Sequence, residues 1–231
     1  MPILDVRKGY TFYSVSFVSF SLKCDTLRAS GYGPKGSETL LLSQMFKLGA
    51  KDLRKTRPTP ETFSTIKRNP IYLVLDNVID TYNIGSLFRL ADAIAAERLY
   101  ICGETEYPPN SRIHKAAVGT EEWVPWEKAE NTIELVKKLK SKGVGIISVE
   151  QDARSIPYTL LSTKIDFPVA IVVGNETGGI SESVLAASDV IVELPMFGVN
   201  KSLNVWGSAA VVAYQVLESL ILKPYARKKK V

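Results

Sequence analysis

Three polar clusters in this 231-residue chain follow apolar segments and carry side chains that bind ligands or move protons. Asn83 and Arg89 lie in N-I-G-S-L-F-R-L-A-D-A, Glu176 lies in V-V-G-N-E-T-G-G-I, and Ser202 and Asn204 lie in L-P-M-F-G-V-N-K-S-L-N-V. Amide, hydroxyl, carboxylate and guanidinium groups are suited to positioning, acid–base chemistry and anion binding. The clusters therefore favour a polar ligand that is held at several points.

The first cluster is predicted to open a helix over about residues 84–96, with Asn83 as its cap and Arg89 in its second turn. An arginine among apolar helical positions needs a partner. That partner is either a carboxylate such as Asp92 or an external phosphate. The residues alone leave both alternatives open.

The second cluster follows a predicted buried strand, and its glycines permit close approach of a ligand to the backbone. Glu176 is a candidate general base, and a structural role in fixing the loop is an equal alternative. The phosphate-binding pattern G-x-x-x-x-G-K-[ST] is absent, and no G-x-G-x-x-G follows the first strand. The sequence thus gives poor support to a P-loop or a nicotinamide Rossmann site.

The third cluster joins a predicted strand at 190–194 to a predicted helix at 203–222. In an open α/β sheet, ligands bind beyond the carboxyl ends of the strands, where this loop must lie. Ser202 or Asn204 is also a natural cap for the helix that follows, which is the simpler alternative.

Apolar strands alternate with helices from residue 70 onward. Strands are predicted near 71–77, 98–102, 144–149, 169–173 and 190–194, and helices near 84–96, 130–142, 181–188 and 203–222. Continuously apolar strands separated by helices indicate an α/β fold with a parallel sheet that is covered by helices on both faces.

Composition narrows the classes of function. A net charge of +5 favours a polyanionic partner, and the basic tail at 223–231 concentrates part of that charge. Two cysteines cannot build a disulfide framework, and no spacing resembles a metal site. The single histidine, His114, is interpreted as a loop residue. No run of about 18 apolar residues is present, so no membrane span is predicted.

The N-terminal part of the chain differs from the rest. Residues 1–44 combine a strand-like segment at 10–22 with a predicted helix at 38–48 and carry no motif. We interpret residues 1–44 as an extension that the working domain does not need. Residues 45–69 form a basic N-terminal segment, which is either a solvated surface or a surface for RNA phosphates.

The three clusters, in this order and near these separations, resemble the three motifs of the SpoU/TrmH-type RNA ribose 2′-O-methyltransferases of the SPOUT superfamily. The resemblance covers about residues 66–222. H-K-A-A-V-G-T-E-E-W-V-P-W at 114–126 is similar to the family's segment between its second and third strands. The resemblance implies a methyltransferase domain over 70–222 with five or six parallel strands and a C-terminal deep trefoil knot.

The resemblance also implies a function. The family methylates a ribose 2′-hydroxyl in structured RNA, with S-adenosylmethionine as cofactor and without a metal. It implies a cytoplasmic homodimer that binds tRNA or rRNA and no membrane. In the family the knot encloses the cofactor, and the matching positions are Val149, Gly174, Leu194, Met196 and Leu203.

The same resemblance implies the catalytic set. Arg89 matches the arginine that activates the 2′-hydroxyl together with an RNA phosphate, facing the cofactor of the partner subunit. A guanidinium barely loses its proton, so a phosphate clamp is an alternative role for Arg89. Asn83 and Asn204 would position groups, Ser202 would hydrogen-bond to substrate or loop, and Glu176 would brace the cofactor loop.

Two departures from the family pattern remain. Trp206 stands beside Gly207, at a position where family members commonly carry a smaller residue. The bulky indole either fills the space left by Gly207 or alters the wall of the cofactor pocket. Residues 1–65 are too short for the separate RNA-binding module of many rRNA-modifying relatives, which tilts the expected substrate toward tRNA. The alternative function is a non-catalytic RNA-binding relative of the same fold.

Overall fold

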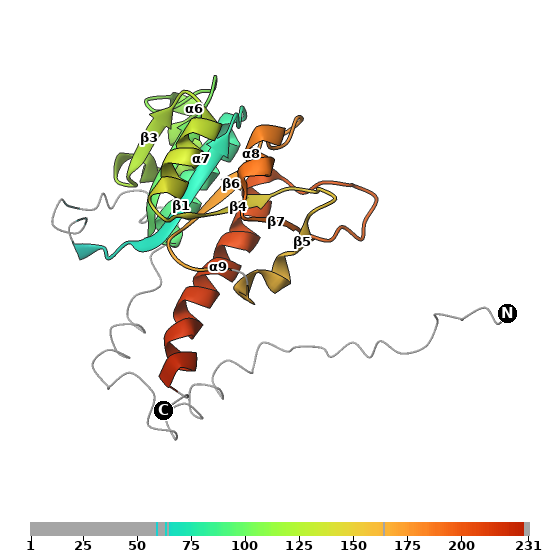
Figure 1. Cartoon of the computed structure of the whole chain (residues 1–231). Coiled ribbons are helices and arrows are strands. Elements are labelled where there is room, and N and C mark those ends of the chain that lie inside the picture. The colour runs from blue at the N-terminus through green and yellow to red at the C-terminus, as the bar shows by residue number, and fades with distance from the viewer. Residues whose placement is uncertain (1–58, 60–62, 64, 164, 229–231) are drawn as a thin grey trace, which may run out of the picture. The chain divides into compact units, whose positions relative to one another are not determined.

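The computed structural model describes residues 59, 63, 65–163 and 165–228 (Figure 1). All of them belong to the compact unit that begins at Thr56. The elements predicted at 10–22 and 38–48, the extension at 1–44, most of the basic segment at 45–69 and the last three residues of the tail lie outside the described residues.

Seven strands form one sheet in the described part of the chain. They are β1 (Asn69–Asp76), β2 (Ala96–Cys102), β3 (Trp126–Ala129), β4 (Gly145–Val149), β5 (Ile156–Pro157), β6 (Val169–Val173) and β7 (Val190–Glu193). Their order is β3-β2-β1-β6-β4-β7-β5, and every pairing is parallel. The predicted parallel α/β class is confirmed, with more strands than the five or six that the family resemblance implied.

Helices cover both faces of this sheet (Figure 1). They are α5 (Thr81–Ala93), α6 (Ser111–Ala117), α7 (Thr132–Ser141), α8 (Glu182–Ala187) and α9 (Val205–Lys228), with 3-10 turns η1 (Thr120–Glu122) and η2 (Tyr158–Thr163). Side chains from α5, α6 and α9 share one apolar core with the sheet, and side chains from α7 and α8 share the other. The four predicted helices are present, and α6 was not predicted.

The apolar character of β1 follows from this layering. Leu73 and Leu75 are buried in the core beneath α5 and α9, whereas Val74 is buried in the core beneath α7 and α8. Successive side chains of a strand point to opposite faces, so a strand with two covered faces needs apolar residues at every position.

The carboxyl ends of β1, β4, β6 and β7 lie at one edge of the sheet because all pairings are parallel. From β1 the order runs through β2 to β3 on one side, and through β6, β4 and β7 on the other. Ligands of open α/β sheets bind beyond the carboxyl ends where the strand order reverses. The fold thus brings the loops that carry the three polar clusters to one edge.

Two helix starts differ from the expected caps. The N-cap of α5 is Asp80, whose carboxylate accepts a hydrogen bond from the backbone N–H of Tyr82 at 2.8 Å. The prediction that Asn83 caps this helix is wrong, because the helix begins earlier and Asn83 is buried in its first turn. At α9 the side-chain oxygen of Asn204 accepts from the N–H of Trp206 at 3.0 Å, so Asn204 does cap that helix.

His114 lies on α6, so its interpretation as a loop residue is wrong. Among the described helices, none combines the length and the apolar character that crossing a membrane requires.

Helices α5 and α6 approach closely at Gly85. A Cβ at this position would lie 2.5 Å from Cβ of Ala116 and 2.7 Å from the backbone oxygen of Ile113. Since one of these neighbours is backbone, a side chain at Gly85 would force the two helices apart. A Cβ at Gly207 of α9 would instead meet only the Leu203 side chain, at 3.6 Å, which is an ordinary contact.

Substitution of these two glycines should therefore have opposite effects. We expect Gly85→Ala to lower the free energy of unfolding by about 1–3 kcal/mol, the usual cost of overpacking. Gly207→Ala should leave it unchanged or raise it by up to about 1 kcal/mol, because alanine has the higher helix propensity. Urea unfolding of the two variants and of the wild type measures both changes in the free energy of unfolding. Equal stability of Gly85→Ala and Gly207→Ala would contradict the close approach of α5 and α6.

Candidate functional site

A cavity of about 270 Å³ lies at the carboxyl ends of β4, β6 and β7. Its wall includes all five residues that the family resemblance assigned to the cofactor: Val149, Gly174, Leu194, Met196 and Leu203. Glu176 and Ser202 also line it. The structure thus brings together residues from the second and third polar clusters and from the end of β4.

The cavity wall also has polar residues that the sequence analysis did not single out, namely Glu150, Gln151, Asn175, Thr177, Glu193 and Ser208. Glu150 and Gln151 directly follow β4. The other loops were found by looking for polar residues that follow a buried strand. The same rule identifies Glu150 and Gln151.

The loop after β6 closes tightly on itself. The backbone N–H and C=O of Asn175 pair with those of Gly179 at 3.0 Å in both directions. The side-chain oxygen of Asn175 accepts from the N–H groups of Thr177 and Gly178 at 2.9 and 2.8 Å. A Cβ at Gly174 would lie only 2.2 Å from the carbonyl carbon of Gly179. Glycine at position 174 therefore allows this closure, and it leaves bare backbone on the cavity wall.

Glu150 and Gln151 connect this loop to its neighbours. The Glu150 carboxylate accepts from the N–H of Ile180 at 2.9 Å, which joins the loops after β4 and β6. Gln151 Nε2 donates to the backbone oxygen of Lys201 at 2.5 Å, which joins the loop after β4 to the loop after β7. Hydrogen bonds therefore link all three loops around the cavity.

Glu176 ties the cavity to α5. Its carboxylate accepts from the N–H groups of Ile79 and Asp80, both at 3.0 Å, and from Asn83 Nδ2 at 2.8 Å. Desolvation raises the pKa of Glu176, but the hydrogen bonds from Asn83, Ile79 and Asp80 outweigh it, and the pKa lies below its ordinary value. Asn83 does not line the cavity but supports a residue that does.

Asp76 is a buried carboxylate that the sequence analysis missed. It ends β1 with 2% of its surface exposed. One carboxylate oxygen accepts from the hydroxyl of Thr132 at 2.5 Å, and the other from the N–H and the hydroxyl of Ser181, both at 3.0 Å. Asp76 thus fixes the starts of α7 and α8 to the end of β1.

Arg89 is exposed on α5 and has no hydrogen bond or ion pair with any of the described residues. Its suggested structural partner is engaged elsewhere, because Asp92 accepts from Trp123 Nε1 at 2.7 Å. The alternative in which Arg89 forms a structural ion pair with Asp92 is therefore wrong. Neither Arg89 nor Asn204 lines the cavity.

Trp206 has 44% of its surface exposed and is not part of the cavity wall. The bulky side chain that departs from the family pattern thus does not narrow the cavity.

The fold is similar to that of solved RNA-modifying enzymes. The AdoMet-bound rRNA methyltransferase from Sinorhizobium meliloti matches with a TM-score of 0.60 and 26% identity, over 73% of this chain and 60% of that one. The TrmH/SpoU tRNA modifying enzyme of A. aeolicus matches with a TM-score of 0.62 and 24% identity, over 75% and 83%. The second likeness supports the fold alone.

The sequence is similar to that of the 23S rRNA (guanosine-2′-O-)-methyltransferase RlmB of Nitrosomonas europaea, with 31% identity over 163 residues. The match covers 71% of this chain and 62% of that relative. The chain spans less than two thirds of the length of this and similar curated relatives.

The profile of the SpoU rRNA Methylase family matches residues 70–214, which is more than half of the chain. This region contains all three polar clusters, the sheet except for the first residue of β1, and the cavity at the carboxyl edge of the sheet. The chain belongs to the SpoU rRNA methylase family.

Proposed function

We propose that this chain is an S-adenosylmethionine-dependent RNA ribose 2′-O-methyltransferase. The observation that carries the proposal is the cavity whose wall contains Val149, Gly174, Leu194, Met196 and Leu203. Two solved structures to which the chain is similar are described as AdoMet-bound or as AdoMet complexes. The proposed substrate is structured RNA, with tRNA and rRNA as separate arms of the test.

The residues present suit this cofactor. Apolar side chains of Leu194, Met196 and Leu203 can contact the adenine ring and the carbons next to the sulfonium, and bare backbone at Gly174 permits close approach. Bound there, S-adenosylmethionine supplies a methyl group on a positively charged sulfur. The chain's own task is to bring a ribose hydroxyl in line with that methyl group and to help the hydroxyl lose its proton.

Arg89 binds the RNA phosphate next to the target ribose in this proposal. Its exposure, and the lack of any partner among the described residues, leave its guanidinium available for a phosphate. A guanidinium stays protonated in proteins, so Arg89 aims and polarises the hydroxyl and is not the base.

Ser202 and Asn204 complete the proposed substrate contacts. Ser202 lines the cavity, where its hydroxyl can hydrogen-bond to the ribose or to the loop. Asn204 accepts with its side-chain oxygen at the cap of α9, and its amide nitrogen can donate a hydrogen bond to substrate.

Glu176 is a brace in this proposal. Three donors occupy its carboxylate, and its lowered pKa makes it a weaker proton acceptor. Through Glu176 the loop that carries Gly174 is fixed to the start of the helix that carries Asn83 and Arg89.

The proposed enzyme is a homodimer that uses the outer face of α9. Ala209, Val212, Ala213 and Val216 of this 24-residue helix are buried in the core. Other large apolar side chains lie on the opposite side of the helix, at about 100° per residue: Val211, Tyr214 and Ile221, which are 37–65% exposed. A helix that is apolar on both sides is usually covered on both.

We further propose that the chain from β4 onward is threaded as a deep trefoil knot. Three observations support it: β6 lies between β1 and β4, β7 pairs with β4, and α9 packs with the core of α5. Hydrogen bonds also join the loops after β4, β6 and β7 around one cavity. Such threading would be an exception to the rule that chains avoid knots.

The role of Arg89 is tested by Arg89→Ala. Methylation of bulk tRNA or rRNA should fall by about 100-fold or more, because an electrostatic contact to the reacting group is lost. Affinity for S-adenosylhomocysteine, measured by calorimetry with ATP and NAD as negative controls, should stay unchanged. The matched control is Arg98→Ala, which removes a partly exposed arginine that pairs with Glu127 on the edge strand β3.

Retained turnover in Arg89→Ala would refute the role of Arg89. Failure of the folded wild type to bind S-adenosylhomocysteine would refute the proposed enzyme and favour a non-catalytic RNA-binding relative.

The dimer is tested by Tyr214→Arg, which places a charge on the outer face of α9. Sedimentation velocity should show dimers for the wild type and monomers for the variant, with unchanged thermal unfolding of the subunit. Mixing inactive Arg89→Ala with an inactive cavity variant, Leu203→Arg, should restore methylation, since a mixed dimer then holds one intact site. No restoration in verified mixed dimers would show that Arg89 serves the cavity of its own chain.

The brace is tested by Glu176→Gln. The lowered pKa means that the wild type gains stability above the ordinary carboxyl pKa of 4.5 and loses it as the pH falls through the folded-state value. The variant should therefore unfold at lower urea than the wild type at pH 7, and the difference should shrink below pH 4.5. A matched control is Glu134→Gln, which removes an exposed carboxylate on α7.

The same variant separates a brace from a base. Loss of a general base costs roughly 10²–10⁴-fold in rate. Folded Glu176→Gln should lose less than that, and a larger loss at full saturation with both substrates would assign Glu176 to proton transfer.

A further inference from the structure

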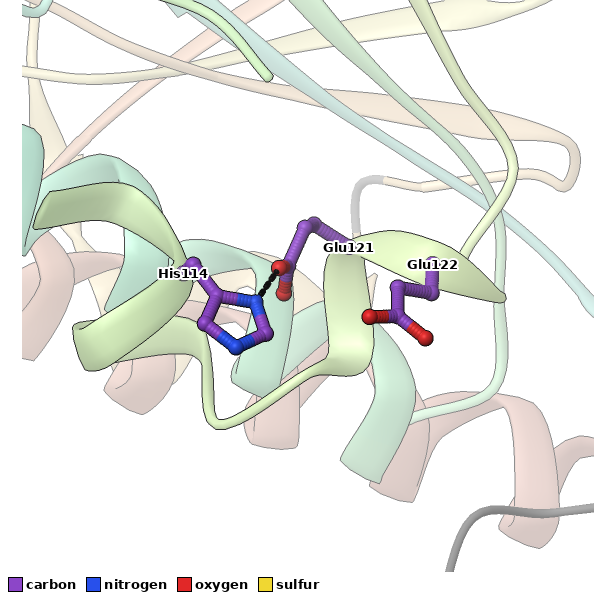
Figure 2. A group of neighbouring side chains, drawn as sticks. All are labelled: His114, Glu121 and Glu122. Carbon is purple, nitrogen blue, oxygen red and sulfur yellow. Dashed lines mark hydrogen bonds and ion pairs between the residues drawn. The ribbon is translucent and has the colours of Figure 1, made fainter. Parts of the chain in front are cut away.

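A second cluster of side chains able to bind a ligand lies between α6 and η1 (Figure 2). His114 comes from α6, and Glu121 and Glu122 come from η1. One nitrogen or oxygen atom from each side chain lies within 4.8 Å of those from the other two. None of the three residues lines the cavity at the sheet edge, so this cluster is not part of the site described above.

The backbone brings the three residues together. Val118 and Gly119 both have a left-handed conformation, with φ of 59° and 91°, and they reverse the chain between α6 and η1. The N–H of Val118 donates to the carbonyl of His114 at 2.9 Å. Positions separated by seven residues in sequence therefore become direct neighbours.

Glu121 is the residue whose environment is incomplete. Its side chain is only 8% exposed. One carboxylate oxygen contacts Nδ1 of His114, and Figure 2 shows the carboxylate facing the imidazole. The other oxygen, Oε2, is buried without a hydrogen-bond partner. A buried carboxylate oxygen without a hydrogen-bond donor destabilises the folded protein, and the His114 imidazole contacts only the other oxygen, Oε1.

We propose that His114, Glu121 and Glu122 bind a divalent transition-metal ion, with Zn²⁺ as the preferred ion. An imidazole nitrogen with two carboxylates suits Zn²⁺, whereas Mg²⁺ and Ca²⁺ prefer oxygen ligands alone. The ion supplies the positive charge that Oε2 of Glu121 lacks. His114 and Glu122 are exposed, so the ion can enter from solvent and keep water in its remaining positions.

The site is structural in this proposal. The ion ties η1 to α6, and α6 packs against α5 at Gly85, where no side chain fits. Helix α5 carries Asn83 and Arg89. Binding should therefore stiffen the support of that helix, and no step of methyl transfer passes through the ion. This inference does not depend on the proposed enzymatic activity.

The test is a Zn²⁺ titration of the full chain, purified without a histidine tag and treated with EDTA, against a fluorescent chelator as competitor. The wild type should bind one Zn²⁺ per chain at this site. Glu121→Gln and His114→Ala should each bind it at least about 10–100-fold more weakly, because loss of a group that merely supports a ligand already costs that much. Glu134→Gln on α7 has the same change of charge at an exposed position and should bind as the wild type does.

Thermal unfolding provides a second readout and a check of folding. Zn²⁺ should raise the midpoint temperature of the wild type and of Glu134→Gln, and should leave that of Glu121→Gln unchanged. Should Glu121→Gln not fold, His114→Ala carries the test, because this side chain is 56% exposed. Cys102 will not compete for the ion, since burial raises the pKa of its thiol to about 12.

Equal Zn²⁺ affinity of the wild type, Glu121→Gln and His114→Ala would overturn the proposal. Displacement of Zn²⁺ by an equal concentration of Mg²⁺ would overturn the assignment to a transition metal.

Discussion

Backbone N–H groups lose their strand partners at the carboxyl edge of the sheet, and the arrangement of the loops there depends on how these groups are satisfied. Three carboxylates accept hydrogen bonds from these N–H groups. Asp76 accepts from Ser181, Glu150 accepts from Ile180, and Glu176 accepts from Ile79 and Asp80. Each bond joins segments far apart in the sequence, and a buried unpaired N–H would be costly. The shape of the cavity therefore depends on carboxylates that bind backbone N–H groups, whereas the side chains of Arg89, Ser202 and Asn204 are exposed.

Sequence periodicity predicted the long buried elements well, and the short ones poorly. The segments 71–75 and 169–173 are apolar because helices cover both faces of the sheet, and this pattern is easy to read. Helix α6, with only Ile113 and Ala117 buried, has too little apolar periodicity to be noticed. Strands β3 and β5 have four and two residues, and edge strands this short carry no pattern.

The site was predictable as far as local motifs reach. Loops after buried strands gave Gly174, Glu176 and Ser202, which do line one cavity. Asp76 was missed, because its partner Ser181 is 105 positions away and no local spacing reveals such a bond. The prediction placed the cap of α5 at Asn83 because the contact of Asn83 with the distant Glu176 also leaves no local sign in the sequence. An asparagine near the start of a helix has the same pattern whether it caps the helix or is buried in its first turn.

The position of β6 between β1 and β4 has a consequence for synthesis of the chain. Ile71 of β1 pairs with Val169 of β6, so one edge of β1 has no partner until the chain has been made almost to its last quarter. Until then the edge of β1 that will face β6 is unpaired, and an unpaired strand edge is a template for pairing with other chains. Domains with such distant pairings fold slowly and expose this edge for longer. The strand order thus leaves this edge of β1 without its partner during most of the synthesis of the chain.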